Sequence, residues 1–194
     1  IFPIMTSSLT KSLTALMASA LFMGSAYAAA PRVEFTTTEG PIVVQLNPDR
    51  APQTVKNFLQ YVNDGFYKGT IFHRVIGAFM IQGGGFTEDL TQKQTRAPIP
   101  LEARNGLRND KYTIAMARTG YPHSATSQFF INVADNDFLN ADRASDGYGY
   151  AVFGQVMSGT DTVDKIAEVE TTSKKGMNDV PVKPVVILDA KVLP

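Results

Sequence analysis

The sequence contains no cysteine, no tryptophan and only two histidines, His73 and His123. Without cysteine the chain forms neither disulfides nor a thiolate nucleophile, and two widely separated histidines make a poor metal site. The 18 basic and 18 acidic side chains give a formal net charge of zero, with no block of lysine or arginine. Such a balance provides no electrostatic footprint for nucleic acid. Any chemistry must therefore use other side chains or the backbone.

The first 28 residues differ in composition from the rest of the chain. Lys11 is their only charged residue, residues 13–23 are mainly apolar, and the small-x-small sequence AYA follows at residues 26–28. The apolar run is about half of the roughly 20 residues that span a bilayer. We therefore predict a signal peptide that starts at Met5, after a few upstream residues, and is cleaved after Ala28. Residues 29–194 would be the exported domain, without a stable membrane association.

The composition of the chain, 44% hydrophobic and 19% charged, fits one ordinary globular domain. Alternating apolar residues on both sides of Glu39-Gly40 predict an antiparallel hairpin. Apolar residues at helical spacing predict a helix over residues 52–63, and Ser158 is expected to start a second helix through a capping box. Further short apolar runs bring the total to seven or eight strands. This content predicts a closed antiparallel β-barrel capped by two α-helices, because closure removes exposed edges.

Residues 72–86, FHRVIGAFMIQGGGF, place a histidine and an arginine in an apolar segment. A desolvated arginine must be paired or have a function, whereas His73 is expected to be a core histidine with satisfied hydrogen bonds. The glycines after Gln82 lack the Lys-Ser/Thr of a phosphate loop, so they indicate a bulge or a close backbone approach. Ser124 and Ser127 lack the G-x-S-x-G frame of a hydrolase nucleophile.

Apolar side chains and amides are expected to lie together near Arg74. Alternate residues of a strand share a face, which places Met80 beside Gln82 and Gln128 beside Phe130. Two interpretations stay open at this point, namely a groove served by the arginine or the ordinary core of a barrel. Two polar loops, residues 87–109 and 140–149, also have two interpretations, because long ordered loops are either functional or surface insertions.

Three separated motifs resemble those of one family. FHRVI..FMIQGG, MAR....SATSQFFINV and YAVFGQV occur in this order and are similar to the cyclophilins, the peptidyl-prolyl cis/trans isomerases, most closely their Gram-negative periplasmic branch. The resemblance extends from Arg32 to Pro194. It implies an eight-stranded antiparallel barrel capped by two helices, an active site in a groove on the outer surface, and no cofactor. It further implies a periplasmic protein, expected to be a monomer, whose partners are proline-containing segments of exported polypeptides.

The resemblance also implies roles for individual residues. Arg74 matches the catalytic arginine of the family. The other matched positions bind the substrate: Phe79, Met80, Phe130 and Leu139 match the proline pocket, Gln82 and Gln128 match groove amides, and Ala117 and Arg118 match the segment whose backbone binds the substrate chain.

The sequence departs from the family pattern at several of these positions. Gly77-Ala78 replaces the usual Pro-Gly before the pocket, Arg118 and Thr119 stand where Asn and Ala are common, and Tyr150 stands where many members have His. Phe138 stands where cyclosporin-sensitive members carry Trp. Because a phenyl ring has no N–H to donate, we predict weak cyclosporin binding.

The implied activity is rotation about Xaa-Pro peptide bonds, with Arg74 as the donor that favours the twisted bond. Two alternatives stay open. One is a non-catalytic periplasmic chaperone that holds proline-containing segments in the same groove. The other is a barrel that holds a small ligand in its lumen, which large inward side chains disfavour.

Overall fold

The structure, a computed structural model, describes residues 29–194, so the predicted signal peptide in residues 1–28 lies outside the described residues. Residues 29–194 form ten strands, two α-helices and one 3₁₀ helix. Their bounds are β1 Arg32–Thr37, β2 Gly40–Leu46, α1 Pro52–Asn63, β3 Thr70–Ile76, β4 Met80–Thr87, β5 Thr113–Met116, β6 Phe129–Asn132, η1 Asp137–Leu139, β7 Val152–Ser158, α2 Thr160–Ala167, β8 Thr171–Lys174, β9 Met177–Pro181 and β10 Ile187–Leu193.

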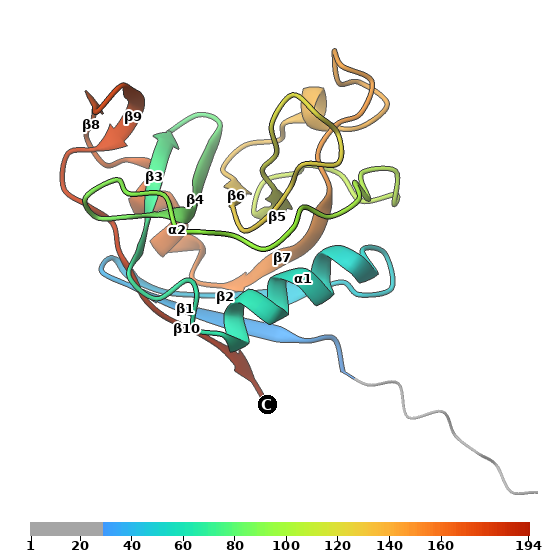
Figure 1. The fold of residues 1–194 in the computed structure, drawn as a ribbon, viewed down its shortest axis with the longest axis horizontal. Coiled ribbons are helices and arrows are strands. Elements are labelled where there is room, and N and C mark those ends of the chain that lie inside the picture. Colours follow the sequence, from blue (N-terminus) through green and yellow to red (C-terminus); the bar gives the residue numbers. More distant parts are fainter. Residues whose placement is uncertain (1–28) are drawn as a thin grey trace, which may run out of the picture.

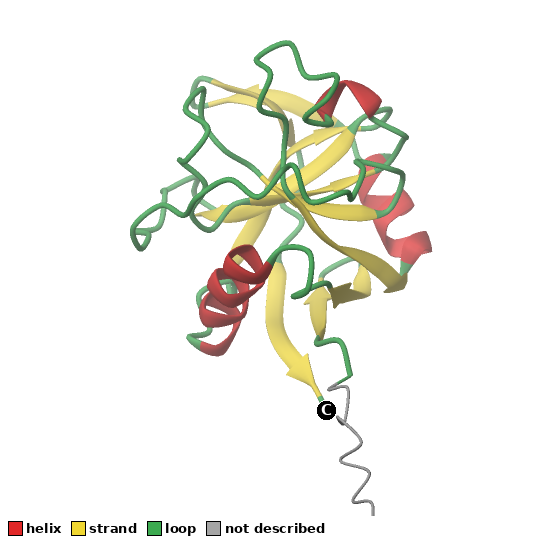
Figure 2. Ribbon diagram, turned by 90° about the vertical axis from the view of Figure 1, so that its right-hand side faces the viewer, coloured by secondary structure: helices red, strands yellow, loops and turns green. Residues whose placement is uncertain are grey.

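Eight of these strands form one curved antiparallel sheet, in the order β10-β1-β2-β7-β5-β6-β4-β3 (Figure 1). The two α-helices lie apart, at different ends of the curved sheet (Figure 2), and both pack into the main core. The inner face is filled by aromatic rings, with Phe35 stacked on Phe129 at 5.1 Å and Phe58 packed edge-on against Phe129 at 5.9 Å between ring centroids. These rings occupy the space that a small ligand in the lumen would need.

The prediction of a closed barrel was wrong, because the sheet is an open half-barrel with β3 and β10 at its edges. The two edges meet only through one bridge, Ile71 to Val186, and through backbone bonds such as that from the Phe72 N–H to the Val185 carbonyl at 3.0 Å. The segment that would extend β10 toward β3 contains Pro184, which has no N–H for a ladder. A continuous ladder of hydrogen bonds between β10 and β3, which would close the barrel, is therefore interrupted at Pro184.

The β8–β9 hairpin, which the sequence did not lead us to expect, covers the β3 edge. Its Val180 packs with Ile71 and Val186 in a small apolar cluster outside the main core. The hairpin turn uses Lys175 at φ 51° and Gly176 at φ 79°, the left-handed geometry of a type I′ turn. A covered edge strand is protected from pairing with other chains. The hairpin therefore gives β3 the protection that a closed barrel would have given it.

The helix predicted over residues 52–63 is confirmed as α1, whereas the capping box predicted for the second helix was wrong. The N-cap of α2 is Gly159, in the left-handed conformation at φ 85° and without a side-chain cap. A Cβ on Gly159 would lie 2.2 Å from the Pro41 carbonyl oxygen. Close approach of β2 therefore selects glycine at this position, and Ser158 ends β7 instead.

The first long loop has a structural role at α1. The Glu102 carboxylate accepts hydrogen bonds from the backbone N–H groups of Gln53 and Thr54, at 3.1 and 2.8 Å, and from the Thr54 hydroxyl at 2.6 Å. A carboxylate at a helix N-terminus satisfies free donors and favours the helix dipole. Glu102 thus supplies the cap that Ala51, the N-cap residue, does not.

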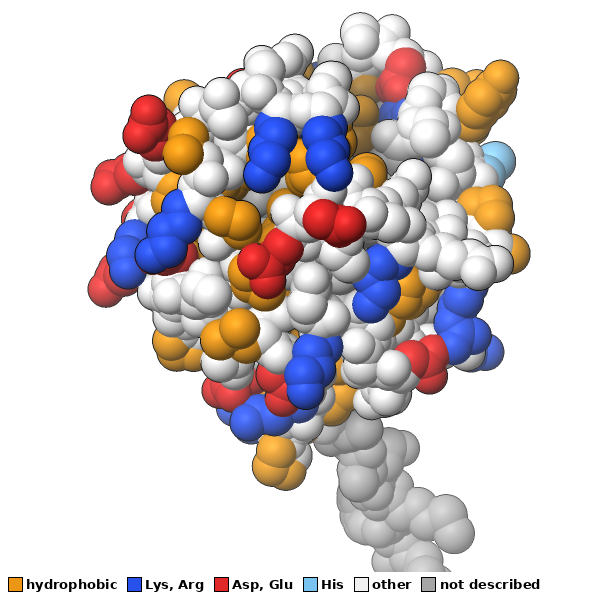
Figure 3. All heavy atoms as spheres, turned by 60° about the vertical axis from the view of Figure 1, so that its left-hand side comes forward, with side chains coloured by type: hydrophobic (Ala, Val, Ile, Leu, Met, Phe, Trp, Pro, Cys, Tyr) orange, Lys and Arg blue, Asp and Glu red, His pale blue; other side chains and the backbone are white. Residues whose placement is uncertain are grey.

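Basic and acidic side chains alternate on the face that carries the β8–β9 hairpin, without an extended area of one sign (Figure 3). Within residues 29–194, no helix is both long enough and apolar enough to cross a membrane.

Candidate active site

A β-bulge in β3 aims the Arg74 side chain. Phe72 pairs with Gly83 while Arg74 pairs with Gln82, so His73 is an extra residue without its own partner on β4. Phe72 and Val75 both enter the main core, which strict alternation would not allow. The bulge places Arg74 on the outer face, and re-aiming a side chain is a common use of bulges beside active sites.

Arg74 begins a row of side chains that crosses five strands of the outer face. It pairs with Gln82 on β4, Gln82 with Phe130 on β6, Phe130 with Ala115 on β5, and Ala115 with Val152 on β7. Paired residues of neighbouring strands project from the same face. The row therefore leads from a cation, through an amide, to an apolar floor.

The apolar floor is a second hydrophobic cluster, separate from the main core. Its buried members are Met80, Ala115, Phe130, Leu139 and Val152, and its half-buried members are Ile76, Phe79, Leu107, Ala117 and Tyr150. The predicted proline-pocket residues all belong to this cluster. The interpretation of these residues as ordinary barrel core was therefore wrong, because they pack on the opposite face of the sheet from the core.

The Arg74 side chain is half-buried and takes part in none of the ion pairs within residues 29–194. Its guanidinium is thus available to a ligand at the edge of the apolar cluster. A guanidinium offers several N–H donors in a fixed planar arrangement, so it is suited to bind an electron-rich group of a ligand.

The two predicted groove amides are in contact. Gln82 Nε2 donates a hydrogen bond to Gln128 Oε1 at 3.0 Å, which fixes the orientation of both side chains. The Gln128 side chain passes over Gly85, where a Cβ would lie 2.5 Å from its Cγ. The glycine run after Gln82 therefore leaves room for a side chain of the groove, in agreement with the predicted close approach.

Phe79 is held at the groove despite the unusual Gly77-Ala78 before it. Its N–H donates to the Ile76 carbonyl at 2.9 Å, and its carbonyl accepts from the Asn136 amide at 2.8 Å and from the Val133 N–H at 3.0 Å. Gly77 is needed for packing, because a Cβ there would lie 2.8 Å from the Ala167 carbonyl oxygen at the end of α2. The turn is therefore anchored on both sides.

A network of buried asparagines stands behind Phe79, and sequence reasoning missed it. Asn136 donates to Asn132 at 2.8 Å, Asn132 donates to Asn109 at 3.2 Å, and Asn109 donates to Asn140 at 3.1 Å. Satisfied buried amides specify a unique packing. The network connects the loop that carries Phe79 with both ends of η1, so it fixes the positions of Phe79 and Leu139 relative to each other.

Phe138 and Leu139, on η1, occupy different positions relative to the pocket. Leu139 is buried in the apolar cluster, whereas Phe138 is 57% exposed and leans on Phe79 with ring centroids 5.5 Å apart. Phe138 therefore lies at the exposed edge of the apolar cluster and not within it.

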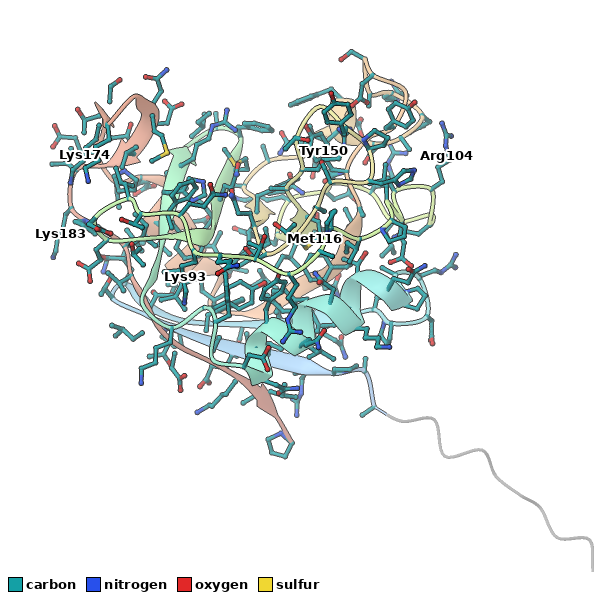
Figure 4. The ribbon with its side chains drawn as sticks, in the orientation of Figure 1. Lys93, Arg104, Met116, Tyr150, Lys174 and Lys183 are labelled. Carbon is teal, nitrogen blue, oxygen red and sulfur yellow. The ribbon has the colours of Figure 1, made fainter. Side chains whose placement is uncertain are left out.

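Ala117 and Tyr150 border the apolar cluster, and the Arg118 guanidinium lies over the Tyr150 ring. The Ala117 N–H donates to the Gln128 carbonyl at 3.0 Å, and the Tyr150 ring packs edge-on against Phe130 at 5.7 Å and 79°. Figure 4 labels Tyr150 among the loops above β5 and β6. The structure thus brings every predicted site residue to the outer face of β3, β4, β5 and β6 and to the adjacent loops.

The expectation for His73 was wrong in one respect. The residue is buried, as predicted, but its Nδ1 has no hydrogen-bond partner and its ring packs against Phe86 at 4.6 Å. Burial, with a smaller effect from the Arg74 cation, lowers the pKa of His73 to about 4. His73 is therefore neutral at neutral pH.

The outer face of the open half-barrel carries an apolar cluster, a hydrogen-bonded pair of amides and an arginine without an ion-pair partner among residues 29–194. The family model for cyclophilin type peptidyl-prolyl cis-trans isomerases matches residues 32–192. The chain belongs to this family, whose members bind proline-containing peptides, and it is a peptidyl-prolyl cis/trans isomerase.

Relatives of known name agree with this assignment. Peptidyl-prolyl cis-trans isomerase cyp18 of Streptomyces antibioticus is 63% identical over 162 residues, covering 83% of this chain and 98% of the relative. Peptidyl-prolyl cis-trans isomerase B of Escherichia coli is 57% identical over 157 residues, covering 80% and 95%. Peptidyl-prolyl cis-trans isomerase A of Dickeya dadantii is 55% identical over 161 residues, covering 83% and 84%.

Solved structures give the same fold. The crystal structure of a cyclophilin type isomerase from Cryptosporidium parvum has 28% identity and a TM-score of 0.72, covering 85% of this chain and 98% of that chain. A second crystal structure of that protein, obtained in the presence of the dipeptide Ala-Pro, has a TM-score of 0.71 at 28% identity, covering 84% and 99%.

Proposed function

We propose that the groove beside Arg74 is the catalytic site, and that this domain, residues 29–194, acts as a monomer on Xaa-Pro bonds of exported proteins during their folding. One observation carries the proposal: the cation and the apolar pocket belong to a single row of paired residues, Arg74, Gln82, Phe130 and Ala115. A proline ring in the pocket would bring its nitrogen toward the guanidinium.

The mechanism follows from amide resonance. Rotation about the peptide bond has a barrier of roughly 18–20 kcal/mol, because the twisted state loses resonance. The twisted state also carries a lone pair on the proline nitrogen, to which Arg74 donates an N–H. Since neither planar isomer offers that lone pair, the interaction is stronger in the transition state than in either ground state.

Other residues of the site bind the two halves of the substrate separately. The pocket of Phe79, Met80, Phe130 and Leu139 grips the proline ring, while Gln82 and the backbone at Ala117 and Arg118 bind the preceding chain. A turnover on the order of 10³ s⁻¹ requires a barrier of about 13 kcal/mol, so the site must supply roughly 6 kcal/mol. A charge-assisted hydrogen bond, dehydration and restraint of the chain together reach this magnitude.

Exchange between the cis and trans isomers of a short Xaa-Pro peptide tests the proposal. Faster exchange at substoichiometric protein supports catalysis at the groove, provided that it disappears when the groove is altered. Shift changes without faster exchange would instead support the alternative of a chaperone that only binds proline-containing segments. The structure of the Cryptosporidium parvum relative obtained in the presence of the dipeptide Ala-Pro makes Ala-Pro the first sequence to use.

The exposed ring of Phe138 is proposed to limit cyclosporin binding. We expect Phe138→Trp to strengthen cyclosporin binding by about tenfold or more, because an indole adds an N–H donor at the rim of the groove. Inhibition of peptide isomerisation by cyclosporin measures the effect. Tyr148→Trp, a similar change at an exposed ring on the loop before Tyr150, is the matched control and should leave inhibition unchanged. Nanomolar inhibition of the unaltered protein would contradict this expectation.

We also propose that the protein is exported to the periplasm. The apolar run in residues 13–23 and the AYA sequence at residues 26–28 support this proposal. Expression of the full chain in a Gram-negative host should yield a periplasmic protein whose mass corresponds to an N-terminus at Ala29. A protein that stays in the cytoplasm with residues 5–28 attached would contradict the proposal.

A further inference from the structure

The side chain of Arg118 is buried although the residue borders the groove. Only 1% of the side chain is exposed, whereas the residue as a whole is half-buried, so its accessible surface belongs to the backbone. The backbone is the part that is proposed to bind substrate. The charged side chain lies against the loop of residues 140–149 and the Tyr150 ring, so its role differs from that of the backbone.

Every nitrogen of the Arg118 guanidinium has a partner. Nε donates to the Gly149 carbonyl at 2.9 Å, Nη1 donates to the Thr119 carbonyl at 3.0 Å, and Nη2 pairs with the Asp146 carboxylate. The guanidinium also lies over the Tyr150 ring, 4.5 Å from its centroid. Arg118 therefore joins the segment after β5 to the loop of residues 140–149, two segments far apart in sequence.

Asp146 organises the same loop from the other side of the ion pair. Its Oδ1 accepts hydrogen bonds from the Tyr148 and Gly149 N–H groups at 2.9 and 3.2 Å. The hydrogen bond from Arg118 is the largest cause that lowers the pKa of Asp146 to about 2, so the pair is ionised throughout the physiological range. The loop is thus folded around the pair.

The loop ends directly on the proline pocket. The Tyr150 N–H donates to the Leu139 carbonyl at 2.9 Å, and the Tyr150 ring packs edge-on against Phe130. Gly149 has φ 69°, and a Cβ there would lie 2.6 Å from the Ala141 N, so the chain is tightly constrained just before Tyr150. A displacement of this loop would therefore move one wall of the pocket.

We propose that Arg118 is a positioning residue for the isomerase reaction: its buried side chain clamps the loop of residues 140–149 and holds Tyr150 and Leu139 against Phe130. This inference rests on the proposed location of the site. Arginine is required because a planar group with donors on three nitrogens meets two carbonyls, a carboxylate and a ring face at once. Lysine keeps the charge but cannot make this set of contacts. Asparagine, which is common at this position in the family, has a side chain too short to reach the Asp146 carboxylate and the Gly149 carbonyl.

The test compares peptide binding with turnover in four variants. Arg118→Met should raise the dissociation constant of an Ala-Pro peptide about tenfold or more, with a smaller change in kcat, because Arg74 itself is untouched. Asp146→Asn should give a change in the same direction, and Arg118→Lys should not restore the affinity. Arg96→Met, which removes the exposed ion pair between Arg96 and Asp64, the C-cap residue of α1, is the matched control and should leave affinity unchanged.

A merely structural role would give a different result. In that case Arg118→Met would lower the thermal midpoint but leave the dissociation constant unchanged at temperatures where the variant is folded, and this outcome overturns the proposal. If Arg118→Met does not fold, an unchanged dissociation constant in Asp146→Asn overturns it as well. Wild-type turnover in Arg74→Ala would instead refute the proposed site, so the two failures are distinguishable.

Discussion

Arg74→Ala should lower kcat/KM for an Ala-Pro peptide by about two orders of magnitude or more, which corresponds to about 3 kcal/mol of transition-state stabilisation. The expected loss is large because no other cation of the described groove is free for this role, since Arg118 is committed to Asp146. The fold should persist, because Arg74 is half-buried and removing it breaks no ion pair within residues 29–194.

The measurement is the rate of peptide isomerisation at several protein concentrations, with circular dichroism to confirm folding. Arg74→Lys should fall between wild type and Arg74→Ala, because an ammonium keeps the charge without the fixed geometry of the guanidinium. Arg32→Ala, at the start of β1 and away from the groove, is the control. Near-normal activity in folded Arg74→Ala would place the chemistry elsewhere.

The free energy of unfolding should fall by about 2.5 kcal/mol between about pH 7 and about pH 4.5, because of His73. The pKa of His73 is about 4 in the folded protein, from an ordinary value of 6.5, so the unfolded chain binds the proton at a higher pH than the folded chain does. Stability is therefore present above the unfolded pKa and is lost as the pH falls toward the folded pKa. The lowered pKa values of Asp89 and Asp146, about 2, matter mainly at lower pH.

Urea unfolding at a series of pH values measures this loss. His73→Phe, which does not titrate, should show a much shallower dependence over the same interval. His123→Gln is the matched control, because His123 is exposed and its change should preserve the wild-type dependence. Equal slopes for His73→Phe and wild type would show that the pH dependence arises from other groups.

The parts of the fold with a strong periodic signal could be predicted from the sequence. Helix α1 was predicted over the residues that form it, and the β1–β2 hairpin was predicted with its turn one residue late, since Thr38 and Glu39 form the turn and Gly40 begins β2. Closure of the barrel could not be predicted, because the strand count is the same for open and closed sheets. Whether the sheet is open or closed depends on how much of the segment around Pro184 forms hydrogen bonds with β3.

The residues of the site were predicted through the family motifs, but their arrangement was not. A bulge at His73 has no signal in a run of apolar and aromatic residues, and strict alternation would have placed Arg74 on the same face as Phe72. The partners of Asn136 and Glu102 likewise come from segments far away in the chain. Long-range polar contacts of this kind depend on the final packing, so local pattern does not reveal them.

The most direct test of the account is NMR exchange spectroscopy of an Ala-Pro peptide with substoichiometric isotope-labelled protein. We predict exchange cross-peaks between the cis and trans forms, together with shift changes centred on Arg74, Met80, Gln82 and Phe130. The exchange rate and the shift changes should both saturate with the same apparent dissociation constant as the peptide concentration rises. Exchange without shift changes in the groove, or shift changes there without exchange, would contradict the claim that this groove rotates the bond.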